Sequence, residues 1–181
     1  MRFQYTNSTS PPPSTPTSNF TITAPPPQTS GASPPPTTPS PPPPILHRTL
    51  TLTHFHRIRV TVSAPWKTLY DQGGLLFARP RADGEKKWVK AGIEFFDGRA
   101  CATVVAKDNW ADWSSVEVGS DTVTVEFARE AIPETDQPSL WVYLVEDGGR
   151  RRPIREITWA FEGGPGWCLC CEADAYAGGS E

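Results

Sequence analysis

The stretch that most constrains the fold runs from residue 88 to residue 96, where apolar and polar side chains alternate with period two. In a β-strand, alternate side chains point to opposite faces of the sheet. One face would be small and apolar, which suits a core, and comprises Val89, Ala91, Ile93 and Phe95. The other face would carry an aromatic ring, a cation and an anion on one surface, and comprises Trp88, Lys90, Gly92, Glu94 and Phe96. The stretch therefore predicts a strand with one buried face and one candidate binding face.

Further strands are predicted along most of the chain, at residues 57–62, 72–79, 99–106, 113–118, 121–128, 140–146 and 153–161. Glycine-containing turns separate several of them, and Asp97-Gly98 is a two-residue hairpin signal. Gly73-Gly74 indicates a close backbone approach or a bulge. No segment of ten or more residues has a 3.6-residue apolar period. Short strands with glycine-rich turns predict an all-β, antiparallel sandwich or barrel.

The first 44 residues differ from the rest, since they hold 15 of the 21 prolines and a single charged side chain, Arg2. Such a segment cannot bury enough apolar surface to offset its ordering entropy, so residues 1–44 are predicted to be disordered. Residues 19–24 are a short β-favouring island and a candidate for a docked edge strand. We expect a β-sandwich domain at residues 45–171 and a flexible tail at residues 172–181.

Charge and composition exclude several classes of function. The net charge is −3 with no basic face, so we expect no nucleic-acid partner. No apolar run has the length of a membrane span or a secretory signal, which predicts a soluble, cytoplasmic protein. Four cysteines are too few for a disulfide framework. Cys168, Cys170 and Cys171 form one crowded cluster without a nearby histidine, so we expect neither a metal site nor a cofactor.

Several motifs, taken in order, resemble one known family. They are residues 70–75 (YDQGGL), 88–94 (WVKAGIE), 112–114 (DWS) and 155–159 (REITW). The family is a domain-of-unknown-function family that contains the fungal regulation-of-enolase protein. The resemblance implies a concanavalin A-like sandwich (jelly roll) of two antiparallel sheets, from the lectin/glucanase superfamily, and no established activity. It also implies a closing C-terminal strand, which this chain is predicted to lack.

The candidate ligand-binding residues lie around the face of residues 88–96. Trp88, Lys90 and Glu94 would form a platform for sugar rings with polar groups to orient them. Flanking loops would add Trp110 and Asp112 on one side and Tyr70, Asp71 and Gln72 on the other. The alternative is that Lys90 and Glu94 form only a surface ion pair. Three further tryptophans are expected to pack in the sandwich, namely Trp113, Trp141 and Trp159.

Glycoside hydrolysis needs two carboxylates at a defined separation. Glu94 is the only carboxylate on its strand, and the others lie singly on separate predicted strands, at Glu117, Glu126 and Glu156. We therefore predict a non-enzymatic binding or regulatory module with no catalytic residues, with a carbohydrate as the expected ligand and a link to the regulation of sugar metabolism. A glycoside-acting enzyme and a purely protein-interacting module are the alternatives, and the sequence leaves the oligomeric state open.

Overall fold

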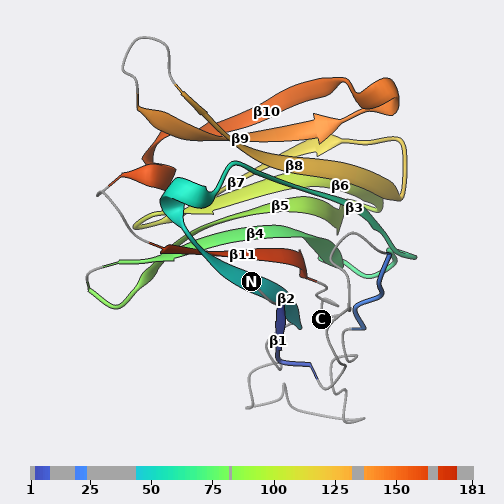
Figure 1. Cartoon of the computed structure of the whole chain (residues 1–181). Helices are drawn as coiled ribbons and strands as arrows, with labels where there is room; N and C mark the ends of the chain where they lie inside the picture. The colour runs from blue at the N-terminus through green and yellow to red at the C-terminus, as the bar shows by residue number, and fades with distance from the viewer. Residues whose placement is uncertain are drawn as a thin grey trace.

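The chain is a sandwich of two antiparallel β-sheets (Figure 1). A computed structural model describes residues 3–8, 19–23, 44–81, 83–131 and 137–162, together with the backbone of residues 167–174. Among these residues there is no α-helix, and three short 3₁₀ segments occur, η1 (Leu52–His54), η2 (Asp147–Gly149) and η3 (Thr158–Phe161). The predicted all-β sandwich is confirmed.

The larger sheet has seven strands. Their spatial order is β1 (Gln4–Thr6), β2 (Ile45–Thr51), β11 (Trp167–Asp174), β4 (Gln72–Pro80), β5 (Lys86–Phe96), β6 (Arg99–Lys107) and β7 (Ala111–Glu117). The smaller sheet has four, in the order β10 (Arg151–Ile157), β9 (Pro138–Val145), β8 (Thr122–Ala131) and β3 (Arg57–Ser63). Every strand pair is antiparallel. The hairpin turn predicted at Asp97-Gly98 joins β5 to β6.

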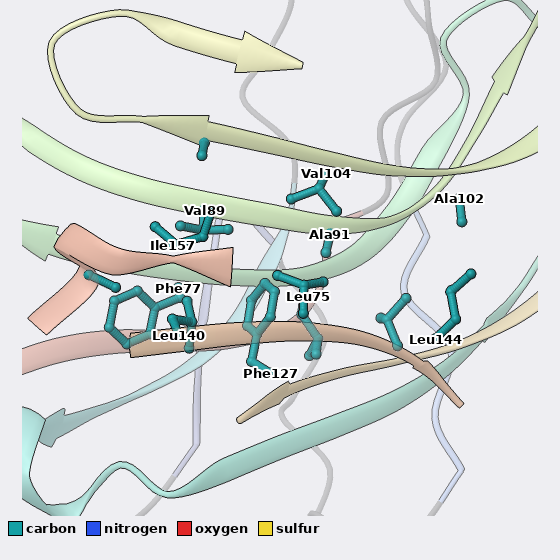
Figure 2. Close-up of a cluster of buried hydrophobic side chains, with 14 of the residues drawn as sticks. Leu75, Phe77, Val89, Ala91, Ala102, Val104, Phe127, Leu140, Leu144 and Ile157 are labelled. Atoms are coloured by element: carbon teal, nitrogen blue, oxygen red, sulfur yellow. The ribbon is translucent and has the colours of Figure 1, made fainter. Parts of the chain in front are cut away.

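The hydrophobic core lies between the two sheets (Figure 2). The larger sheet contributes the predicted inward set of β5, Val89, Ala91 and Ile93, each no more than 1% exposed. Phe95, the fourth member of that predicted set, is only partly buried. The smaller sheet supplies larger side chains that are completely buried, Phe127, Leu140 and Val142. The period-two pattern therefore marked the buried face of β5 correctly.

Gly74 on β4 and Gly92 on β5 face each other across an unusually close strand contact. A Cβ atom added to either glycine would lie 2.6 Å from the Cα of the other. No side chain larger than hydrogen fits there without a backbone shift, which explains why both strands carry glycine in their interior. Gly73-Gly74 is therefore a site of close backbone approach within β4.

The N-terminal region differs from the prediction. Gln4–Thr6 forms β1 and pairs with β2, inside the segment predicted to be disordered. The predicted edge strand at residues 19–24 is not found, since residues 19–23 are described without strand structure and residue 24 lies outside the described residues. β2 itself follows the proline run directly. Although β2 is as long as the predicted strand β3, it was not singled out as a strand beside the proline run.

The C-terminal strand β11 lies between β2 and β4, inside the larger sheet. It extends to Asp174, three residues beyond the predicted domain boundary at residue 171. Residues 175–181, where a closing strand was predicted to be missing, lie outside the described residues. The strand predicted at residues 153–161 ends at Ile157, and η3 follows it.

Candidate binding face

Strand register places the candidate residues in rows on the outer face of the larger sheet, the face turned away from the core. Directly opposed residues in neighbouring antiparallel strands lie on the same face. One row comprises Gln72, Glu94, Cys101 and Glu117, and the next comprises Gly74, Gly92, Thr103 and Ser115. A third comprises Leu76, Lys90, Val105 and Trp113, and a fourth comprises Ala78, Trp88, Lys107 and Ala111. We call this surface the outer face.

Glu94 and Trp113 meet on the outer face although they start in different rows. Trp113 is level with Lys90, four residues or about 13 Å from Glu94 along the strand. The indole Nε1 of Trp113 nevertheless donates a hydrogen bond to Glu94 Oε2 at 3.3 Å. The two side chains therefore lean toward each other across the level of Thr103, which is 2% exposed.

Two further aromatic rings, Phe96 and Tyr70, extend the Trp113 contact toward the β5–β6 turn. Phe96 packs edge-on against Trp113, with 5.4 Å between ring centroids, and Tyr70 stacks on Phe96 at 6.1 Å. Trp113 and Tyr70 remain 44% and 45% exposed. The outer face therefore presents exposed ring surface beside a carboxylate that is itself 6% exposed.

The polar groups beside this ring surface include hydrogen-bond acceptors. Gln72 is the direct cross-strand neighbour of Glu94, and its Oε1 atom is buried without a hydrogen-bond partner among the described residues. Cys101 lies on the other side of Glu94. Burial is the main cause that raises the pKa of the Cys101 thiol, and nearby carboxylates add to it. The thiol is therefore uncharged near neutral pH.

The structure brings together four of the predicted site residues. Trp88, Lys90, Glu94 and Gln72 share the outer face. Glu94 was expected to be turned outward into solvent, but it is buried, because Trp113 and the neighbouring strands surround it. Trp88 and Lys90 are partly buried, at the levels of the fourth and third rows.

Asp112 was assigned to the wrong face. It pairs with Ala106, whose side chain points into the core, so Asp112 lies on the inner face of β7. There it forms an ion pair with Arg155 of β10, and Arg155 Nη1 also donates to Ser114 Oγ at 3.1 Å. These contacts join the edge strands of the two sheets. Asp112 therefore holds the sandwich together at this side.

Asp71 and Tyr70 shape the turn that leads into β4. Asp71 Oδ2 accepts hydrogen bonds from the backbone N–H groups of Lys67 and Thr68, at 3.1 and 2.9 Å. Tyr70 has a positive φ of 69°, which is uncommon for a residue with a side chain. Its N–H donates to the carbonyl of Phe95. Asp71 is thus a turn-forming residue, and Tyr70 is the member of the pair that reaches the outer face.

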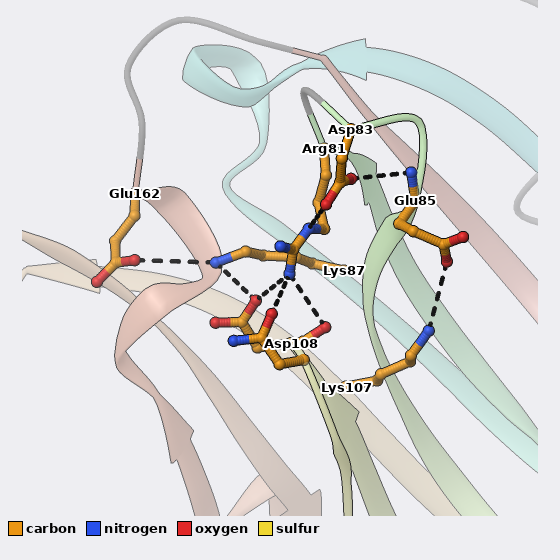
Figure 3. A network of polar contacts seen from close by, with 8 residues as sticks. Arg81, Asp83, Glu85, Lys87, Lys107, Asp108 and Glu162 are labelled. Atoms are coloured by element: carbon orange, nitrogen blue, oxygen red, sulfur yellow. Dashed lines mark hydrogen bonds and ion pairs between the residues drawn. The ribbon is translucent and has the colours of Figure 1, made fainter.

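Trp110 lies on the β6–β7 turn, next to a network of polar contacts around Asp108. Figure 3 shows that network. Arg81 donates to Asp108 Oδ1 at 3.0 Å and to Asn109 Oδ1 at 2.7 Å. Lys87 Nζ lies 2.9 Å from the same Asp108 oxygen. The Trp110 side chain is 88% exposed. An exposed indole on an anchored turn is available for contact with a partner or ligand.

The motif at residues 112–114 contacts two of the other motifs that carry the family resemblance, those at residues 88–94 and 155–159. In residues 112–114, the outward Trp113 binds Glu94, while the inward Asp112 and Ser114 bind Arg155. For Trp113 the sequence offered a place at the rim of the candidate face or packing in the sandwich, and packing was favoured, whereas the ring lies on the outer face. The signal was present, since Trp113 stands between polar neighbours on a strand with few apolar residues. Trp159, by contrast, packs against the core as expected.

The described residues show no sign of a membrane-spanning helix or of a metal centre. No helix in the described part of the chain is long and apolar enough to span a bilayer. Within those residues no three side chains of the metal-binding types come together. The side chains of Cys168, Cys170 and Cys171 lie outside the described set, so the prediction about that cluster is not tested.

The chain belongs to the family described as "Protein of unknown function (DUF1349)", whose model matches residues 37–167. A protein of Emericella nidulans described as uncharacterized is 44% identical over 119 residues, which are 65% of this chain and 56% of that relative. The Saccharomyces cerevisiae protein named Regulation of enolase protein 1 is 33% identical over 89 residues, covering 46% of this chain and 43% of the relative. This chain therefore spans about half the length of these relatives.

A solved structure supports the fold independently. The crystal structure of a functionally unknown protein from Saccharomyces cerevisiae aligns with a TM-score of 0.52 and 20% sequence identity. The alignment covers 75% of this chain and 76% of that chain. At this identity the likeness shows a shared fold and nothing about activity.

Proposed function

We propose that this protein is a non-enzymatic binding module whose outer face takes a carbohydrate. The observation that carries the proposal is the half-exposed Trp113 ring, held by a hydrogen bond over the buried Glu94 carboxylate. An aromatic ring offers a flat surface to the C–H faces of a sugar, and buried acceptors orient its hydroxyl groups. Tyr70 extends the ring surface through its contact with Phe96.

The proposal is tested by glycan-array screening of the full chain, followed by calorimetric titration with the best ligand. Trp113→Ala and Glu94→Gln should each weaken binding at least tenfold, which is about 1.4 kcal/mol. The matched control is Trp141→Ala, because Trp141 stacks on Tyr143 on the outer surface of the other sheet. Absence of binding to any glycan, or an equal loss of affinity in Trp141→Ala, would contradict the carbohydrate assignment.

A glycoside-acting enzyme is the second candidate, and strand register favours it in one respect. Glu94 and Glu117 occupy the same row of the outer face, two strands apart. Two strand spacings amount to about 10 Å between backbones, and inverting glycosidases hold their carboxyls roughly 6.5–9.5 Å apart. Turnover of a glycoside that Glu94→Gln and Glu117→Gln each abolish would replace the binding proposal with this one.

The name of one relative also supports a regulatory role. The yeast protein at 33% identity is named for regulation of enolase, an enzyme of sugar metabolism. We propose that this chain acts by binding and is linked to the regulation of sugar metabolism, with Trp110, the most exposed large hydrophobic side chain among the described residues, as the contact for a protein partner. Pull-down of enolase by the full chain, compared with Trp110→Ala, tests this second contact. Equal recovery of enolase by the wild type and by Trp110→Ala would show that Trp110 does not contact the partner.

A further inference from the structure

The exposed edges of the two sheets are protected unequally. An edge strand has unpaired backbone groups, which proteins shield with prolines, bulges, positive charges or very short strands. β10 has Pro153, a register shift at that point and several arginines. β1 has three residues, and β3 carries Arg57 and Arg59. β7 has seven residues, an unbroken register, and neither proline nor lysine nor arginine, and its one inward-pointing charge, Asp112, is paired with Arg155 of β10.

The hairpin geometry shows which backbone groups of β7 face outward. Asp97 and Gly98 both have positive φ, as in a type I′ turn, so the flanking pair Phe96 and Arg99 is hydrogen-bonded. Hydrogen-bonded and non-bonded pairs then alternate along the ladder. The even residues of β6 therefore bond to the even residues of β7. The groups left facing the free edge belong to Ala111, Trp113, Ser115 and Glu117.

This edge is complementary to itself in one antiparallel register. With Ser114 opposite Ser114 of a second copy, all of β7 is paired. Trp113 then lies opposite the second copy's Ser115, Asp112 opposite its Val116, and Ala111 opposite its Glu117. No like charges face each other, which cross-strand pairing requires. Just beyond the strand, the exposed Trp110 lies level with the second copy's Val118.

We propose that β7 pairs edge to edge with β7 of a second copy, joining the two larger sheets into one continuous sheet. The long, regular edge without proline, lysine or arginine, its outward backbone groups and the absence of a charge clash carry the inference. The pairing also places Trp113 of each copy beside Ser115 of the other, so the two outer faces adjoin. Main-chain hydrogen bonds between strands supply the affinity, as in other cases of strand addition.

Sedimentation of the full chain over a range of concentrations tests the pairing. The wild type should show a mass that rises toward that of a dimer. Ser115→Pro removes an N–H that faces the free edge and leaves the β6–β7 ladder intact, so it should abolish the dimer. Its circular dichroism spectrum should stay that of the wild type. A wild type that is monomeric at its highest soluble concentration would overturn the proposal.

A charge reversal tests the register without a proline. Ala111→Glu would face the second copy's Glu117 at two symmetric positions, so it should weaken association by about tenfold. Adding Glu117→Lys should restore it. A dimer that is unaffected by Ala111→Glu contradicts this register. If the wild type is monomeric but binds an extended peptide, and Ser115→Pro loses that binding, then the β7 edge pairs with a peptide partner and not with a second copy.

Discussion

Among the described side chains, each sheet buries one glutamate on its outer surface, and the two are held differently. Glu94 on the larger sheet is 6% exposed and Glu126 on the smaller sheet is 0% exposed. Glu94 accepts a hydrogen bond from the neutral indole of Trp113. Glu126 Oε2 lies 2.6 Å from Arg59 Nη2 and accepts from Arg59 Nε at 2.7 Å. Its Oε1 lies 2.8 Å from Arg151 Nε, in an ion pair outside hydrogen-bond geometry.

The surroundings of Glu126 form a closed network. Arg151 also donates to Glu130 Oε1 at 2.7 Å and lies over the ring of Tyr143, 3.8 Å from its centroid. The Tyr143 hydroxyl donates to Glu130 Oε2 at 2.9 Å. Two arginines thus neutralise the buried charge and cover it. Such a site stabilises the fold and offers a ligand little, whereas Glu94 lies beside exposed ring surface.

The largest expected effect is on stability, at the smaller sheet. Glu126→Gln should lower the free energy of unfolding by about 3 kcal/mol, because it leaves Arg59 and Arg151 close together without the charge between them. Urea denaturation measures the change. The control is Glu85→Gln, which alters an exposed pair with Lys107 and should cost about 0.5 kcal/mol or less. A loss under about 1 kcal/mol at Glu126 would contradict the structural role.

The next effect concerns the backbone beneath the candidate site. Gly92→Ala should destabilise the protein by about 2 kcal/mol, because its Cβ would collide with backbone atoms of β4. Gly119→Ala is the matched control, since nothing lies within 4 Å of its added Cβ. Thermal unfolding of the two variants should separate clearly. Similar melting temperatures would mean that the strands can part at this point without cost.

A smaller stability effect, with a large effect on binding, is expected at Glu94. Glu94→Gln should cost about 1 kcal/mol or less, because the amide oxygen can still accept the Trp113 hydrogen bond. The measurement is the same urea titration, run beside Glu126→Gln. If both substitutions cost the same, the two glutamates have equivalent structural roles and the contrast between the sheets fails.

The last effect, a pH dependence at Tyr143, shows only at alkaline pH. Burial first, and then the hydrogen bond to Glu130, raise the pKa of Tyr143 to about 12. Because the folded state favours the neutral phenol, this contribution to stability is complete below the pKa of free tyrosine and declines as pH rises from 10 to 12. Ultraviolet titration of tyrosinate absorbance should show a transition near pH 12. Its presence in Tyr143→Phe would assign it to another tyrosine.

Most strands were predictable because burial of one sheet face imposes a local period-two pattern. Residues 88–96 and the Asp97-Gly98 turn show this most clearly. β1 and β2 were not predictable, since a three-residue strand and a strand beside a proline run lack enough pattern to stand out. β1 and β2 join the larger sheet beside β11, which comes from the other end of the chain. Local sequence and composition do not reveal such a pairing.

The amino-acid order alone specified that alternate side chains of residues 88–96 share a face, because strand geometry is local. It also specified where the chain turns, because glycine and aspartate at those positions favour positive φ. Which side chains meet across strands was decided by register and sheet stacking, which depend on contacts between distant residues. For that reason Trp113 joined Glu94 on the outer face, while Asp112, one residue away, turned inward to Arg155.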